Sequence, residues 1–160
     1  TYSAQNLGTN DLTRIRKGVR AANLMSAVYS VIIYGVVILL MPYLIRLFVS
    51  ENLDEVLHYA DIYIKVCGLF FIPLGMIFIF RNVLQGCGYG FLPMLGGVVE
   101  LLSRGVLAIM AAHRLSYVGV CLANASAWCS AGIFLWIAYY PFMKKLSRRM
   151  NRSAAPSEVR

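Results

Sequence analysis

Long apolar segments alternate with short polar connections along this chain. Four segments are apolar over enough residues to cross a membrane, since roughly 20 helical residues span the hydrocarbon layer. We predict transmembrane helices over residues 21–47, 62–81, 92–112 and 115–143. The pattern therefore indicates an all-α membrane protein, with residues 1–20 and 144–160 as polar flanks.

Prolines and small residues interrupt these segments at defined places. Pro42 and Pro73 lie inside apolar helices, where each removes a backbone hydrogen bond, so both helices are expected to bend, either as fixed structure or as hinges. Ala123, Ala127 and Ala131 recur every four residues in the last segment. This spacing favours close packing against a neighbouring helix.

The connection between the first two segments has a helical pattern of its own. Asn52 followed by Glu55 resembles a capping pattern, and Leu53, Val56 and Leu57 then share one helical face. We predict a short helix here that leads into the second span. It is either an interfacial helix at the membrane surface or a solvated connector.

The third segment carries two opposite charges near its middle. Glu100 and Arg104 are four residues apart, in the order that favours an ion pair on one helical face. Charges at membrane depth are costly and normally turn towards protein or a wet cavity. Two interpretations stay open: a buried pair that fixes helix packing, or a charged lining of a transport pathway in which the neighbouring Arg disfavours Glu100 as a proton carrier.

Composition and charge agree with a membrane protein. Hydrophobic residues make up 59% of the chain and charged residues only 14%, with a mean hydropathy of +0.67. The net charge of +8 gathers just before the first segment and just after the last, at Arg14, Arg16, Lys17, Arg20, Lys144, Lys145, Arg148, Arg149 and Arg152. Basic flanks predict that both ends are cytoplasmic, and without a groove-reading motif they argue against nucleic-acid binding.

Several polar residues are further candidates for the pathway or its gate. Asn82 and Gln85 precede the turn at Gly86 and Gly88, which is expected to be a capped helix end or a cytoplasmic gate. Tyr34 and Asn124 are candidates for cavity lining or for packing between helices.

Enzymatic chemistry finds no support in the sequence. His58 and His113 are peripheral, and the four cysteines, Cys67, Cys87, Cys121 and Cys129, show no metal-ligand spacing. An intramembrane enzyme would need a nucleophile with a base, or clustered metal ligands. We therefore predict no enzymatic activity, no cofactor and no metal site.

Two segments carry a family resemblance. Thr1 to Gly18 reads TYSAQNLGTNDLTRIRKG, with an Ala-Gln-Asn-x-Gly element before a basic turn. Arg81 to Arg104 reads RNVLQGCGYGFLPMLGGVVELLSR, where a Leu-Gln-Gly-x-Gly turn leads to a proline and a Glu-Leu-x-x-Arg helix. With the later Tyr117-Val-Gly-Val and Ala127-Trp128 elements, the chain resembles the C-terminal lobe of multidrug and toxic compound extrusion (MATE) transporters.

The resemblance implies a twelve-helix transporter of two six-helix lobes. Residues 1–20 would hold the cytoplasmic end of the eighth helix and a basic loop, and the four spans would be the ninth to twelfth helices. The chain would then be a partial C-terminal lobe, an expectation that the absent initiator Met supports. Its partners would be the lipid bilayer, the N-terminal lobe and small organic cations.

The resemblance also implies export of drugs or toxins across the plasma membrane, coupled to protons or sodium ions by alternating access. Some members place an acidic coupling residue in the tenth helix, but residues Ile62 to Phe80 contain none. No coupling-ion site is therefore identified in this chain. The alternatives are a lipid-linked saccharide flippase of the same superfamily and a small four-helix membrane assembly subunit.

Overall fold

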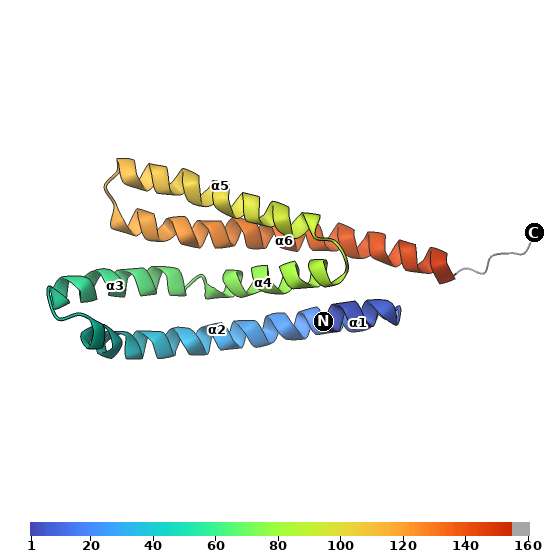
Figure 1. The fold of residues 1–160 in the computed structure, drawn as a ribbon, viewed down its shortest axis with the longest axis horizontal. Coiled ribbons are helices and arrows are strands. Elements are labelled where there is room, and N and C mark those ends of the chain that lie inside the picture. The colour runs from blue at the N-terminus through green and yellow to red at the C-terminus, as the bar shows by residue number, and fades with distance from the viewer. Residues whose placement is uncertain (155–160) are drawn as a thin grey trace, which may run out of the picture.

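The computed structural model describes residues 1–154 and builds them almost entirely from α-helices (Figure 1). This confirms the all-α prediction. The six helices are α1 (Tyr2–Gly8), α2 (Leu12–Phe48), α3 (Leu53–Gly68), α4 (Phe71–Gly86), α5 (Phe91–His113) and α6 (Tyr117–Ala154). By length and hydropathy, α2, α5 and α6 are each able to cross a membrane, and α3 with α4 forms a fourth, bent candidate.

Two helices extend beyond their predicted apolar spans. Asp11 caps α2 by accepting a hydrogen bond from the backbone N–H of Arg14 at 2.9 Å, so the basic flank forms the first turns of the same helix. At the other end of the chain, α6 continues through the basic tail to Ala154. It begins at Tyr117 instead of residue 115, because Leu115 has a left-handed φ of 47° in the preceding turn.

The second predicted span differs most from the structure. Residues 62–81 do not form one helix, because α3 and α4 meet at an angle of 51° across Leu69 and Phe70. Pro73 lies in the first turn of α4 and has no N–H to donate to the carbonyl of Leu69, which accounts for the interruption. The helix predicted to begin at Leu53 is present, but it runs without a break into the first half of this span.

The spans lie side by side in the order α2, α3–α4, α6 and α5 (Figure 1). Small residues set the closest approach between α5 and α6: a Cβ on Gly119 would lie 2.9 Å from the Ala111 Cβ, and one on Gly96 would lie 3.1 Å from Leu135. The predicted small-residue face of α6 is buried at Ala123, Ala127 and Ala131. Packing of this kind needs little side-chain volume and suits a membrane bundle.

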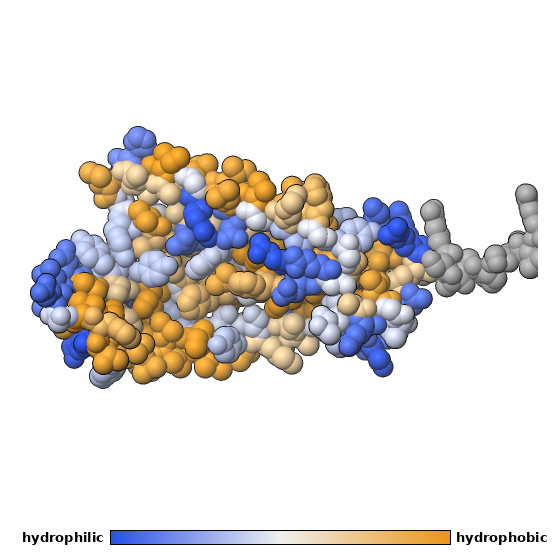
Figure 2. All heavy atoms as spheres, in the orientation of Figure 1, coloured by the Kyte–Doolittle hydropathy of each residue, from blue (hydrophilic) through white to orange (hydrophobic). Residues whose placement is uncertain are grey.

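The main core gathers where α2, α4 and α6 meet, around Ile15, Leu84 and Leu135, which are fully buried. Large apolar side chains remain exposed along the outer faces of α2 and α5. Figure 2 shows this apolar surface, with hydrophilic atoms gathered at the ends of the bundle and in a streak over α4 and α5. A surface of this kind suits a lipid environment.

Candidate transport-pathway residues

The predicted pair on α5 forms an ion pair in the structure. Arg104 donates from Nη2 to Oε1 of Glu100 at 2.7 Å, as the spacing of four residues predicts. The Glu100 side chain is 24% exposed and that of Arg104 is 45% exposed. The pair therefore lies at the edge of the helix packing, within reach of a further partner.

A third charge, at the last residue of the second predicted span, completes the site. Arg81 lies inside α4, and its Nη2 approaches Oε2 of Glu100 to 3.9 Å. The guanidinium reaches α5 beside Gly97, where a Cβ would be 3.8 Å from Nη2, an ordinary van der Waals distance. The sequence held one signal for this placement: the apolar segment runs directly into Arg81, so the helix could be expected to include it. In the structure α4 continues past Arg81 to Gly86.

We call Arg81, Glu100 and Arg104 the charge triad. Two cations share one carboxylate, so Glu100 is compensated on both oxygens and the triad keeps a net positive charge. The Nε of Arg81 is buried and has no hydrogen-bond partner in the described part of the chain. The arrangement joins α4 to α5 and leaves donor capacity for an additional acceptor.

Tyr34 lies far from the triad, in the packing between α2 and α3. Its ring covers Gly68, where a side chain would collide with the ring atoms, and its hydroxyl is 3.4 Å from the carbonyl of Lys65. The ring also meets Phe71 edge-on, with centroids 6.3 Å apart. These contacts fit the packing alternative for Tyr34.

Asn124 lies on α6 and also stays apart from the triad. Its side chain interacts with the hydroxyl of Tyr63 on α3, which in turn contacts the Cys67 thiol. The Cys67 Sγ is 3.7 Å from the carbonyl of Cys121 on α6. Asn124 thus belongs to a small polar seam between α3 and α6.

The turn after α4 is a capped helix end. Gly88 has a φ of 83°, and its N–H donates to the carbonyl of Gln85 at 2.9 Å while that of Tyr89 donates to Leu84 at 2.9 Å. These two bonds form a Schellman motif, which needs a residue with positive φ at this position. At Gly88 the structure therefore fits the first of the two alternatives, a capped helix end.

The other three residues predicted for this turn or gate lie in different surroundings. Gly86 lies against α1, where its Cβ would be 3.6 Å from the Cβ of Ser3. Asn82 is exposed and lines a small pocket of about 240 Å³ between α1, α2 and α4. Gln85 is exposed at the same end. In the described part of the chain no hydrogen bond joins Asn82 or Gln85 to Glu100 or Arg104.

The comparison with protein families settles the class of this bundle. A sequence model of the family named MatE matches residues 1–110. The chain belongs to the MatE family. The match runs from α1 to near the end of α5, so it includes the charge triad, Tyr34 and the turn after α4, and it ends before α6 and Asn124. No curated protein and no solved structure matches the chain.

Membership of the MatE family makes this protein a MATE-type membrane transporter and not an enzyme at the family level. The family resemblance inferred from the two motifs is confirmed. Among residues 1–154, no group of His, Cys, Asp and Glu side chains is arranged to hold a metal ion.

Proposed function

We propose that the protein is a secondary active efflux transporter that exchanges protons or sodium ions for organic, often cationic, drugs or toxins. The observation that carries this proposal is the MatE match over residues 1–110. The bent span formed by α3 and α4 supports it, because broken helices are a common feature of transporters that alternate between two membrane faces.

In this proposal the four spans belong to the C-terminal lobe of a two-lobe transporter. Substrate occupies a cavity between this lobe and an N-terminal lobe. Both ends of the chain face the cytoplasm of a plasma-membrane protein. The basic residues support this orientation, because basic segments favour the cytoplasmic side. The basic first turns of α2 and the basic last turns of α6 lie at the same end of the bundle (Figure 1).

The charge triad is proposed to face the seam between the lobes. Its role there is to hold α4 against α5 and to set the electrostatic potential of the pathway. Glu100 does not carry the coupling ion in this scheme, since two guanidinium groups already compensate its charge. Asn82 and Gln85 form the cytoplasmic rim near the capped turn.

The main alternative within transporters is a lipid-linked saccharide flippase. A flippase of this kind would bind a pyrophosphate at cations in its central cavity. A small assembly subunit is the alternative outside transport, and the family match disfavours it. No contact in residues 1–154 favours either alternative over drug export.

Transport in vesicles tests the proposal. The complete two-lobe protein is reconstituted into liposomes with a fluorescent lipophilic cation at equal concentration inside and outside, and a proton or sodium gradient is imposed across the membrane. We expect dye movement against its own gradient only when one of the two ion gradients is present. Empty liposomes with the same gradients are the control. Absence of flux over a broad panel of organic cations, together with movement of a lipid-linked saccharide, would favour the flippase.

A further inference from the structure

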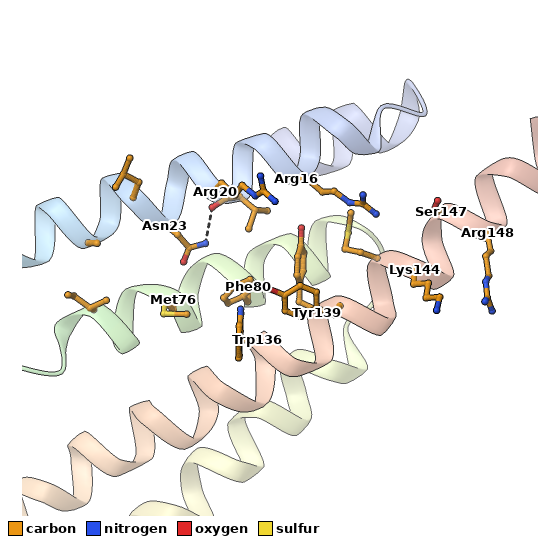
Figure 3. Close-up of a pocket in the computed structure, with 16 residues that line it drawn as sticks. Arg16, Arg20, Asn23, Met76, Phe80, Trp136, Tyr139, Lys144, Ser147 and Arg148 are labelled. Carbon is orange, nitrogen blue, oxygen red and sulfur yellow. Dashed lines mark hydrogen bonds between the residues drawn. The ribbon is translucent and has the colours of Figure 1, made fainter.

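A groove of about 920 Å³ lies between α2 and α6, with α4 as its floor (Figure 3). It is separate from the charge triad, which lies between α4 and α5. The groove forms because α4 packs against both α2 and α6. Side chains of α2 and α6 form its two walls, and side chains of α4 form its floor.

The groove has one basic end. Arg16 and Arg20 on α2 and Lys144 and Arg148 on α6 line this end, and all four are exposed (Figure 3). Within residues 1–154 no carboxylate lies within ion-pair distance of any of the four. Tyr139 lies in the electrostatic field of Arg16 and Arg20 and adds a hydroxyl group. Four basic side chains without a neighbouring carboxylate at one end of the groove would strongly attract an anion.

The rest of the groove is apolar. Ala27 and Ile72 lie at its far end, and Met76, Phe80 and Trp136 line the wall between. From Arg16 to Ala27 the α2 axis advances roughly 16 Å at 1.5 Å per residue. This is about half of the ~30 Å hydrocarbon thickness, the depth that the acyl chain of one leaflet occupies.

A polar acceptor marks the boundary between the two parts. Asn23 donates from Nδ2 to the carbonyl of Val19 at 2.8 Å, but its buried Oδ1 has no partner in the described part of the chain. Buried oxygens of this kind normally accept a hydrogen bond. Asn23 lies one turn below Arg20, where a hydroxylated headgroup would meet its acyl chains.

We propose that this groove binds one anionic phospholipid from the leaflet at the basic end of the bundle. The headgroup phosphate lies among Arg16, Arg20 and Lys144, and an acyl chain fills the apolar part. Trp136 and Tyr140 line the groove from α6 and are partly exposed, and aromatic side chains of this kind favour the boundary between headgroups and hydrocarbon. This inference concerns a lipid site and does not depend on the direction or substrate of transport.

Native mass spectrometry of the protein in detergent tests the site. The probes are dioleoylphosphatidylglycerol and, at equal concentration, dioleoylphosphatidylcholine. We expect retention of the anionic lipid and at least tenfold weaker retention of the zwitterionic one. The double variant Arg20→Gln/Lys144→Gln should lower the affinity for phosphatidylglycerol by about 25-fold, since each basic side chain near an anionic headgroup contributes about fivefold.

The chain offers a matched control with the same loss of charge. Lys17 and Lys145 lie next to the same helix segments, but neither lines the groove, and Lys145 lies over the ring of Tyr89. The variant Lys17→Gln/Lys145→Gln should change the affinity less than threefold. Equal losses in both double variants would show an unspecific charge effect and overturn the proposal.

A third variant tests the apolar part of the site and does not change charge. Ala27→Trp fills the far end of the groove and should weaken phosphatidylglycerol binding while the helix content by circular dichroism stays unchanged. Glycerol 3-phosphate in excess should fail to displace the lipid, because it lacks the acyl chain. Displacement by glycerol 3-phosphate, or equal binding of the two lipids, would contradict the assignment, as would failure to retain either lipid.

Discussion

Removing the carboxylate of the charge triad should cost more stability than removing either guanidinium group. In Glu100→Gln the two cations lose their shared partner and are left facing each other. In Arg81→Gln the 2.7 Å contact between Glu100 and Arg104 remains, and only the 3.9 Å contact is lost. The order of the two effects therefore follows directly from the geometry.

The magnitude follows from the distances and the exposure. Two unit charges about 4 Å apart attract by about 4 kcal/mol at an effective dielectric of about 20. Desolvation and side-chain ordering cancel most of this gain, and exposed pairs retain about 0.2–1 kcal/mol. Arg81 and Glu100 are 30% and 24% exposed, so we expect a coupling free energy of about 1–2 kcal/mol, between the exposed and buried limits.

A double-mutant cycle measures this coupling. The free energy of unfolding in detergent is determined for Arg81→Gln, Glu100→Gln, the double variant and the unchanged protein. The pair of Lys65 and Asp61 serves as the control, since it is more exposed, at 58% and 42%, and lies on one helix. The same cycle there should give only about 0.3–0.5 kcal/mol. Equal couplings in the two cycles, or no coupling at Arg81, would refute the triad as a link between α4 and α5.

Three further predictions follow from packing and burial. Gly119→Ala should destabilise the bundle by about 1–3 kcal/mol in a thermal unfolding assay, because the new Cβ would lie 2.9 Å from that of Ala111. Gly105→Ala is the control: it has no neighbour within 4 Å and should be neutral or slightly stabilising in the same assay. Pro73→Ala should straighten the 51° bend and lengthen the distance between spin labels at the start of α3 and the end of α4, and an unchanged distance would show that packing alone sets the bend. Burial raises the pKa of the Cys87 thiol in the turn after α4, so it stays protonated near neutral pH and should react with maleimide much more slowly in the native than in the unfolded protein.

The fold class was predictable because long apolar segments leave few alternatives. Length and hydropathy located the spans, and four-residue spacing predicted the contact between Glu100 and Arg104. The small residues of α6 likewise predicted a closely packed helix face. These are local properties, and each depends on residues one or two helical turns apart.

The third member of the triad and the groove were not predictable in the same way. Arg81 reaches Glu100 because the turn at Gly88 places α4 beside α5. The break between α3 and α4 was signalled by Pro73, but hydropathy alone treated the segment as one helix. The groove is lined by residues of α2 and α6 that are more than 100 positions apart in the sequence. A periodic pattern in the sequence relates only residues a few helical turns apart and does not predict such a pairing.

The central claim is that the charged face of α5 is turned towards protein and not towards lipid. Spin labels at Ser103, beside Glu100 on the helix, and at Leu102, which is 62% exposed, test it by power saturation in liposomes with the native cysteines replaced. The account predicts that the label at residue 102 meets molecular oxygen in the lipid, whereas the label at residue 103 is shielded from oxygen or meets a water-soluble nickel complex. High oxygen accessibility at residue 103, equal to that at residue 102, would contradict it.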